Sequence, residues 1–378
     1  MAEHATNPLT IFLAGGGTGG HLYPGIAVAE ALRRRVPDCR PIFLCTQREI
    51  DRVILEAAQL EFVPQPIVPP VRTVGGLLRF WRSWRETKDL ISQQLRRRRP
   101  AAVLGLGGYA AGVAVKTAAL KKIPTAIINP DVIPGKANQY LLRHARYLCC
   151  QFEQTESHVS SAQRSKIRLT GCPIRSDIAH LPTRAAAALR LNLDPRLMTL
   201  SITGASLGAQ TVNEATLEML KELKLQGWQI LHLAGREHAL KVREAYREMQ
   251  VDARVVDFTP AMADVWAVTD LAVSRAGASS CAELSASGVA SILMPYPYHQ
   301  DMHQRANAKV LADAGAAVLV DDEKDAKKNA AKLRAAITPL LYDQTKRSAM
   351  SQAARKLGKP DAAEAVASLV IEMAGGSR

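Results

Sequence analysis

The chain has 378 residues, of which 47% are hydrophobic and only 5% aromatic, a composition typical of two α/β domains with buried parallel strands. Its formal charge of +14 favours an anionic partner, either a nucleic acid, a membrane surface or an acidic ligand. We find no secretion signal and no apolar run long enough to span a bilayer. The six cysteines lack CxxC spacing, which argues against a disulfide or zinc framework and fits buried thiols in a reducing cytoplasm.

Strands and helices alternate through the first part of the chain. Strands are predicted at residues 10–15, 41–45, 102–105, 125–128 and 147–150, and helices at 24–35, 48–58 and from about 75 to 99. Residues 61–74 hold four prolines and are predicted to be a loop. Such alternation predicts a doubly wound parallel sheet.

Polar turns and prolines at residues 157–197 interrupt this alternation and are expected to link two domains. A second series of strands follows at 198–203, 229–234, 254–258, 271–273, 291–294 and 317–320. The predicted domains are therefore residues 8–165 and 166–350, each Rossmann-like. The helix after Pro360, within about 350–378, is free to pack back on the first domain.

The first strand ends in a glycine-rich loop, residues 15–20, followed by His21. Glycines let the backbone approach a ligand closely, and the start of the next helix offers N–H groups to an anion. An NAD site would favour an acidic residue at the end of the second strand, where this chain has Cys45, Thr46, Gln47 and Arg48. A dinucleotide site needs no imidazole, so His21 is a candidate for chemistry.

A second candidate site lies late in the chain, at residues 274–283. Small residues there allow a helix N-terminus to approach a diphosphate, and Glu283 could accept hydrogen bonds from two sugar hydroxyls. Gln304 and Asn307 are three residues apart on a predicted helix, so both amides can face one sugar. An ordinary strand–helix turn with a solvent-exposed Glu, followed by a polar surface helix, would also explain these residues.

Five blocks then follow one another in order: residues 16–21 with Pro24, 107–112, 204–209, 274–283 and 301–307. With these motifs the chain, from residue 10 to about 320, resembles the MurG family. Members of that family transfer N-acetylglucosamine (GlcNAc) from UDP-GlcNAc to the lipid-linked acceptor undecaprenyl-pyrophosphoryl-MurNAc-pentapeptide. The resemblance implies the GT-B fold, in which two Rossmann-like domains face a cleft. The N-terminal domain would bind the acceptor and the C-terminal domain most of the UDP-sugar.

The resemblance also implies roles for single residues. His21 would be the general base or its close support, Glu283 would bind the uridine ribose, and Gln304 and Asn307 would bind the GlcNAc hydroxyls. The other implied donor-binding residues are Thr18, Gly19, Gly20, Asp131, Arg175, Ser206, Thr259, Met262, Gly277, Ala278, Ser279 and Ser280. The acceptor pyrophosphate would lie at Gly16, Gly17, Gly107, Gly108 and Tyr109.

The chain departs from the family pattern at two places. After Ile128 the family usually has His-Glu-Gln-Asn, whereas this chain has Asn129 where a Glu is expected and Asp131 where an Asn contacts the donor. The loop at 204–209 lacks a second Gly, since Ala205, Ser206 and Leu207 follow Gly204. These changes concern the fine donor and acceptor contacts.

An amphipathic stretch combines apolar and basic residues at the start of a predicted helix. Its members are Leu77, Leu78, Arg79, Phe80, Trp81, Arg82, Trp84 and Arg85, and they include half of the four tryptophans. This mixture suits an anionic headgroup interface, and a lipid-linked acceptor favours that interpretation over a core helix with a solvated basic face. Nucleic acid is the weaker alternative, because no nucleic-acid motif occurs.

No Asp-x-Asp or HExxH motif occurs, so we expect no metal and no cofactor, and a diphosphate held by N–H groups instead. The expected partners are UDP-GlcNAc, an undecaprenyl-linked acceptor, the anionic inner-membrane surface on its cytoplasmic side, and a cell-wall synthesis complex; nucleic acid is not expected. Two alternatives stay open. One is a GT-B enzyme with a different acceptor, such as a diacylglycerol glycosyltransferase, or a UDP-GlcNAc epimerase. The other is a nucleotide-sugar binder without activity.

Overall fold

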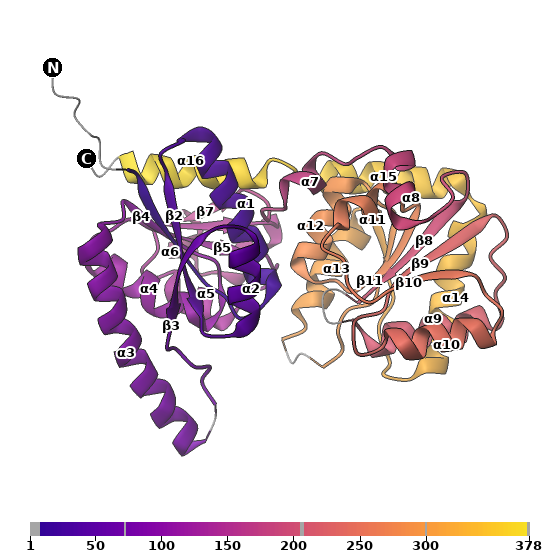
Figure 1. Ribbon diagram of the computed structural model, residues 1–378, viewed down its shortest axis with the longest axis horizontal. Coiled ribbons are helices and arrows are strands. Elements are labelled where there is room, and N and C mark those ends of the chain that lie inside the picture. Colours follow the sequence, from indigo (N-terminus) through magenta and orange to yellow (C-terminus); the bar gives the residue numbers. More distant parts are fainter. Residues whose placement is uncertain (1–7, 72, 205–207, 299–300, 376–378) are drawn as a thin grey trace. The chain divides into compact units, whose positions relative to one another are not determined.

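The computed structural model describes residues 8–71, 73–204, 208–298 and 301–375. It forms two compact units (Figure 1). The first unit comprises the chain up to Arg175 together with the segment from Asp361 onwards, and the second comprises Ser176–Pro360. Each is an α/β unit with its own sheet, as the alternation of strands and helices predicts.

The first unit contains a seven-stranded parallel sheet in the order β3-β2-β1-β4-β5-β6-β7. Its strands are β1 (Thr10–Ala14), β2 (Arg40–Thr46), β3 (Glu61–Gln65), β4 (Ala102–Gly105), β5 (Thr125–Asn129), β6 (Tyr147–Cys150) and β7 (Ile167–Leu169). Its helices are α1 (Gly19–Arg35), α2 (Glu49–Ala57), α3 (Val74–Arg98), α4 (Gly108–Leu120), α5 (Lys136–Leu141), η1 (Glu153–His158), α6 (Ser161–Arg164) and α16 (Ala362–Gly375).

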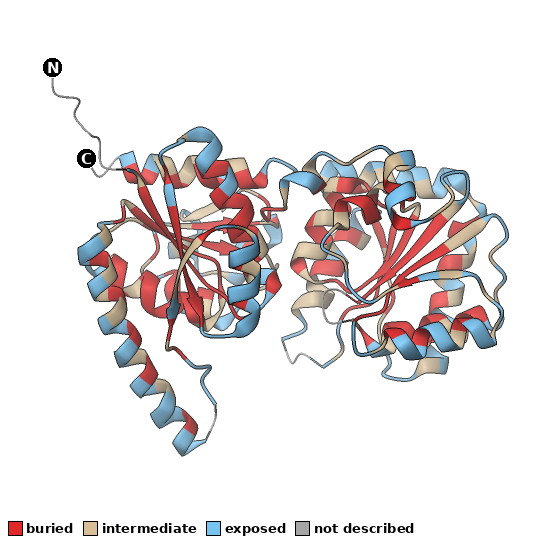
Figure 2. Ribbon diagram, viewed as in Figure 1, coloured by how far each residue is buried: buried red, intermediate tan, exposed pale blue. Residues whose placement is uncertain are grey.

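Helices cover both faces of this sheet, and the strands between them are buried (Figure 2). Successive residues of β1 point to opposite faces, as a strand requires. Ile11 belongs to the core beneath α1 and α16, whereas Phe12 belongs to the core beneath α3 and α4. Burial on both faces explains the continuous apolar runs from which the strands were predicted.

The second unit contains a six-stranded parallel sheet in the order β10-β9-β8-β11-β12-β13. Its strands are β8 (Met198–Thr203), β9 (Trp228–Leu233), β10 (Ala253–Val256), β11 (Leu271–Ser274), β12 (Ser291–Leu293) and β13 (Ala317–Leu319). Its helices are α7 (Ser176–Ala179), α8 (Arg184–Leu191), α9 (Gln210–Leu220), α10 (Ala239–Glu248), α11 (Met262–Val268), α12 (Ala278–Ser287), α13 (His303–Asp313), α14 (Ala326–Tyr342) and α15 (Gln344–Leu357).

Counted within each unit, both sheets contain the strand order 3-2-1-4-5-6 of the Rossmann fold. The predicted fold class of two doubly wound domains is therefore confirmed. In such sheets ligands bind beyond the carboxyl ends of the strands, which is where the glycine-rich loops lie.

Two strands, β3 and β7, were not predicted from the sequence. β3 lies in the proline-rich segment predicted to be a loop, and Pro64 is tolerated because β3 is an edge strand paired only with β2. β7 lies in the predicted link and pairs with β6, so the first sheet continues to Leu169. The first unit consequently extends past the expected boundary at residue 165 to Arg175.

The chain returns to the first unit only with its last helix. α16 packs on α1, and Glu364 accepts from Arg34 at 2.8 Å and from Arg35 at 2.7 Å. α15 stays with the second unit, so the returning segment begins at Asp361 rather than near residue 350. All six cysteines are buried, and within the described residues none of them forms a disulfide bond. Within the described residues, no helix has the length and apolar character needed to cross a membrane.

Candidate donor and acceptor sites

A buried carboxylate holds the first glycine loop in place. The backbone N–H of Gly17 donates to both carboxylate oxygens of Asp51, at 2.8 and 2.9 Å. Asp51 is fully buried and also accepts from the backbone N–H and the hydroxyl of Thr46, at 2.9 and 2.7 Å. Because a Cβ on Gly16 would collide with this carboxylate, only glycine fits at that position. The N–H of Gly17 is thus bound within the protein, and the start of α1 offers N–H groups at Gly19 instead.

His21 lies in the first turn of α1, where the two glycine loops of the first unit meet. Its Nδ1 is 3.3 Å from both the carbonyl oxygen of Gly16 and the hydroxyl of Thr18. On its other side the ring packs against the backbone of Gly107 and Gly108, whose φ angles are +100° and +72°. A Cβ at these positions would approach the ring to 3.3 and 3.1 Å, so glycine serves both the left-handed conformation and the close contact.

The surroundings of His21 favour its neutral form. Burial lowers the pKa of His21, and the Gly16 carbonyl, Asp131 and Asp51 offset only part of that effect. The imidazole therefore has a pKa below its ordinary value of 6.5 and is unprotonated at neutral pH. A neutral imidazole can accept a proton, as a general base must.

Asn129, which stands where the family usually has a Glu, has a structural role in the segment after β5. The side-chain amide of Asn129 is buried and donates to the carbonyl of Asp131 at 2.7 Å, while its oxygen accepts from Asn138 at 3.1 Å. The hydroxyl of Thr155 also donates to the Asp131 carbonyl, at 3.4 Å. Asn129 thereby orders the turn that brings Asp131 near enough to His21 to influence its pKa.

The structure brings together most of the predicted residues of the first unit. The position of a Gly17 Cβ lies 3.8 Å from the hydroxyl of Tyr109, so Tyr109 stands beside the first loop. The guanidinium of Arg175 lies 5.2 Å from the ring centroid of Tyr23, one turn along α1 from Gly19. Ends of β1, β4 and β5 thus contribute to one site around His21.

In the second unit, the residues that were predicted to bind the diphosphate form the N-terminus of α12. Gly277 caps the helix, and Ala278, Ser279 and Ser280 form its first turn, at the end of the helix towards which its backbone N–H groups point. Glu283 follows one turn later and is partly buried. Its Oε2 accepts a hydrogen bond of 2.9 Å from the indole N–H of Trp266, a residue that the sequence analysis did not identify.

The two amides of α13 have different surroundings. Asn307 is fully buried, and its Nδ2 donates to the carbonyl of Ala276 at 3.2 Å, which ties α13 to the loop after β11. The Oε1 of Gln304 accepts from the backbone N–H of Tyr296 at 3.0 Å. The three-residue spacing places both side chains on one face of α13, and a backbone group holds each of them.

The remaining predicted residues of the second unit lie near the start of α11 or cannot be placed. Thr259 accepts from the N–H of Ala261 at 3.1 Å, and Met262 is the first residue of α11. Both follow β10, at the carboxyl edge of the sheet. Ser206 lies outside the described residues.

A buried ion pair beneath α12 was missed by the sequence analysis. Arg275 donates to Asp322 at 2.8 Å, to Thr211 at 2.6 Å and to the carbonyls of Met294 and Pro295 at 3.0 and 3.1 Å. Burial raises the pKa of Asp322, but hydrogen bonds from Thr211 and Arg275, among others, outweigh it and leave that pKa lowered. The ionised pair joins the loop after β11 to three other segments.

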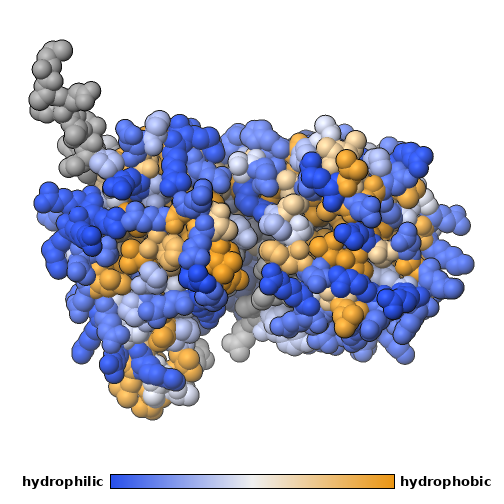
Figure 3. Space-filling view, viewed as in Figure 1, coloured by the Kyte–Doolittle hydropathy of each residue, from blue (hydrophilic) through white to orange (hydrophobic). Residues whose placement is uncertain are grey.

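The first turns of α3 expose apolar side chains. Val74, Leu77, Leu78 and Trp81 are 79, 46, 67 and 59% exposed, and we call these four residues the α3 patch. Figure 3 shows hydrophobic residues gathered where α3 begins. Arg79, Arg82 and Arg85 are exposed beside them.

Two aromatic residues predicted to belong to this surface pack inwards instead. Phe80 and Trp84 are partly buried in the first unit, with ring centroids 5.7 Å apart. Trp84 also contacts α4, since a Cβ on Gly112 would lie 3.4 Å from its ring. The apolar surface is therefore narrower than the sequence indicates.

Comparison with known proteins identifies the family. The model of the glycosyltransferase family 28 N-terminal domain matches residues 11–148, and that of the family 28 C-terminal domain matches 199–366. A relative from Halothermothrix orenii, named UDP-N-acetylglucosamine--N-acetylmuramyl-(pentapeptide) pyrophosphoryl-undecaprenol N-acetylglucosamine transferase, is 32% identical over 98% of this chain and 100% of its own length. The chain belongs to this family of transferases.

A second relative of the same name, from Thermodesulfovibrio yellowstonii, is 35% identical over 95% of this chain and 97% of its own length. Among solved structures, MurG of Acinetobacter baumannii superimposes with a TM-score of 0.76 at 25% identity, covering 97% of this chain and 100% of that one. The UDP-GlcNAc 2-epimerase of Neisseria meningitidis has a TM-score of 0.66 at 12% identity, covering 96% and 100%, a likeness of fold alone.

The positive charge of this transferase-family chain is concentrated in one unit. The first unit holds 26 of the 49 Lys and Arg residues but 15 of the 35 Asp and Glu residues, so its formal charge is +11. The second unit accounts for the remaining +3. The unit that carries the α3 patch is thus the strongly basic one. In the part of the chain that the structure describes, no group of three or more His, Cys, Asp or Glu side chains could hold a metal ion.

Proposed function

We propose that this chain is an inverting transferase that moves GlcNAc from UDP-GlcNAc to the C4 hydroxyl of undecaprenyl-pyrophosphoryl-MurNAc-pentapeptide in peptidoglycan synthesis. The observation that carries this proposal is the end-to-end similarity, at 32 and 35% identity, to relatives named for that transfer. The epimerase shares only the fold. No observation favours a diacylglycerol acceptor.

The donor would bind mainly to the second unit. The N-terminus of α12 presents N–H groups and the positive end of the helix dipole to the diphosphate, which gains charge as UDP leaves. Glu283 would accept hydrogen bonds from the ribose hydroxyls. The N–H of Tyr296 donates to the oxygen of the Gln304 amide and orients it, and the NH₂ group of Gln304 would donate to a GlcNAc hydroxyl.

The acceptor would be activated in the first unit. The C4 hydroxyl oxygen attacks the anomeric carbon, the bond from that carbon to the diphosphate oxygen breaks, and UDP leaves with the electron pair. Neutral His21 would take the hydroxyl proton and later release it to solvent. The acceptor pyrophosphate would lie near the start of α1 and the turn at Gly107 and Gly108.

The acceptor's lipid anchor requires the enzyme to work at a membrane. We place the α3 patch on the anionic cytoplasmic face of the inner membrane, with the arginines beside it facing lipid headgroups. The charge of +11 on the first unit supports this orientation. A cell-wall synthesis complex at that surface is the expected wider setting.

The proposal is tested by supplying the purified chain with radiolabelled UDP-GlcNAc and, separately, a short-chain analogue of the lipid-linked MurNAc acceptor or diacylglycerol. Labelled product is expected only with the MurNAc acceptor. Glu283→Ala should raise the KM for UDP-GlcNAc, whereas Glu248→Ala, an exposed carboxylate at the end of α10, serves as the matched control. Transfer to diacylglycerol alone, or epimerised UDP-sugar without an acceptor, would refute the proposal.

A further inference from the structure

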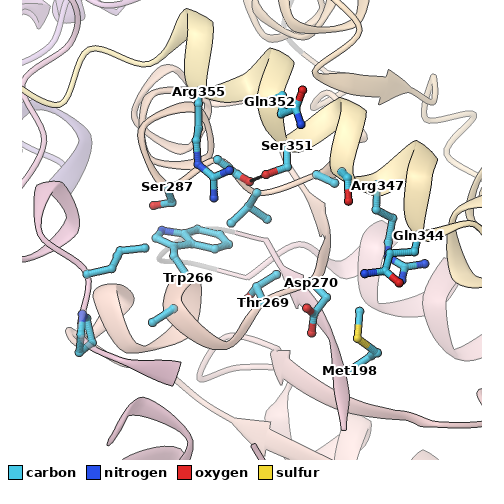
Figure 4. A pocket seen from close by; sticks show the side chains of 17 residues that line it. Met198, Trp266, Thr269, Asp270, Ser287, Gln344, Arg347, Ser351, Gln352 and Arg355 are labelled. Carbon is cyan, nitrogen blue, oxygen red and sulfur yellow. Dashed lines mark hydrogen bonds between the residues drawn. The ribbon is translucent and has the colours of Figure 1, made fainter. Parts of the chain in front are cut away.

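Trp266 stands directly behind the carboxylate that is assigned to the ribose. It lies in α11 and is only 3% exposed, and its indole N–H donates to Oε2 of Glu283 at 2.9 Å. Figure 4 shows the indole within a groove that is lined by residues of α11, α12 and α15. The volume of this groove is about 450 Å³. Glu283, which is not one of the lining residues, meets the indole at its N–H edge.

The helix that carries Trp266 is itself held rigidly. Asp264 in α11 is buried and accepts from Arg190 of α8 at 2.9 and 2.5 Å. Just after α11, the hydroxyl of Thr269 is 2.6 Å from that of Ser201 in β8. These bonds fix α11 to a neighbouring helix and to the central strand, so the indole N–H has a fixed direction.

We propose that Trp266 is a positioning residue for the donor, which orients the Glu283 carboxylate towards the ribose hydroxyls; this inference rests on the proposed function. A Glu side chain on a helix surface samples several rotamers, and fixing one of them on ligand binding costs free energy. The indole N–H only donates, so it holds one carboxylate oxygen and leaves lone pairs to accept from the ribose. Because Trp266 already holds Glu283 in one rotamer, less free energy is lost in fixing that side chain when the ligand binds.

The first test measures affinity by calorimetry for two ligands, UDP and 2′,3′-dideoxy-UDP, which lacks the ribose hydroxyls. Trp266→Phe removes the N–H donor and keeps a buried ring, and should weaken UDP binding about tenfold, as expected for one hydrogen bond to a charged group. Binding of dideoxy-UDP should change less than twofold. Trp266→Tyr restores a donor at the ring edge and should recover part of the loss. Trp228→Phe, in β9, is the matched control and should change neither affinity.

Equal weakening of both ligands by Trp266→Phe would show a merely structural role and overturn the inference, as would no change in either. A second measurement needs no variant of Trp266. In protein with ¹⁵N-labelled tryptophan, the Trp266 indole N–H signal should shift on adding UDP, and Glu283→Ala should move it to the position of an unbonded indole. A signal indifferent to Glu283→Ala would also overturn the inference.

These experiments separate the inference from the proposed function. If the wild-type chain binds UDP and dideoxy-UDP equally well, the roles of Glu283 and Trp266 at the ribose fail, while GlcNAc transfer to the lipid-linked acceptor is unaffected. If discrimination is present but no GlcNAc is transferred, the proposed acceptor fails and the positioning role of Trp266 stands.

Discussion

The α3 patch permits a quantitative test of membrane binding. In the double variant Leu78→Ser/Trp81→Ser, two side chains that are 67 and 59% exposed lose their apolar atoms. Full burial of such a side chain is worth about 1.5–3 kcal/mol, and roughly two-thirds of that remains to be gained at a bilayer. The pair should therefore contribute about 3 kcal/mol, which corresponds to a roughly 100-fold weaker partition onto vesicles.

Partition is measured by co-sedimentation with vesicles that contain phosphatidylglycerol. Leu240→Ser in α10 is the matched control, because Leu240 is also 67% exposed but lies in the other unit. The double variant should lose binding and also transfer to a vesicle-embedded acceptor, while transfer to a short-chain soluble acceptor stays unchanged. Undiminished sedimentation of the double variant, or an equal loss in Leu240→Ser, would refute the assignment of the α3 patch.

Three further outcomes are expected. His21→Ala should lower kcat by about 10²–10⁴ with little change in UDP affinity; because burial lowers the pKa of His21, the wild-type pH–rate profile should fall on the acid side only below pH 6.5, and the variant should lack that limb. Asp322→Ala leaves the charge of Arg275 buried and unpaired, so urea unfolding should show a loss of about 3–5 kcal/mol, much of it recovered by Arg275→Met/Asp322→Leu. Burial lowers the pKa of His232 to about 3, well under its value of 6.5 in the unfolded chain, so its contribution to stability is complete above pH 6.5 and is lost as pH falls. Unfolding between pH 6.5 and 4.5 should reveal a loss of about 2 kcal/mol that His232→Gln lacks.

Local patterns in the sequence predicted most strands because both sheets are buried on both faces. The same patterns carry no information about partners that are distant along the chain. Asp51 lies 34 residues from Gly17, which it holds, and Trp266 lies 17 residues from Glu283. No motif in the sequence around Asp51 or around Trp266 indicates these contacts. Only the family resemblance assigned His21 and Gly107 to one site. Local patterns could not do so, because the contact between the two residues depends on β1 and β4 being neighbours in the sheet.

α3 shows why an amphipathic pattern predicts a helix better than it predicts the orientation of its faces. Its buried stripe in the first half consists of Gly76, Ser83 and Thr87, which are small or polar, whereas Leu78 and Trp81 face solvent. Hydrophobicity would place these two in a core. Small residues on the inner face allow the helix to pack closely, and the large apolar side chains are left outside, where only a membrane or a partner can cover them.

The two glycine-rich regions use the same device, a turn after a strand that leads into a helix, yet their electrostatics differ. The loop at Gly17 lies against the buried carboxylate of Asp51, which takes its N–H and places a negative charge beside any bound anion. Beneath the N-terminus of α12 the buried charges are Arg275 and Asp322, which compensate each other. A diphosphate that gains charge during the reaction is therefore better stabilised at α12 than at the first loop. This difference favours the donor diphosphate at α12. The acceptor pyrophosphate, which we propose to lie near His21, gains no charge in the reaction, and a nearby carboxylate there assists the removal of the hydroxyl proton.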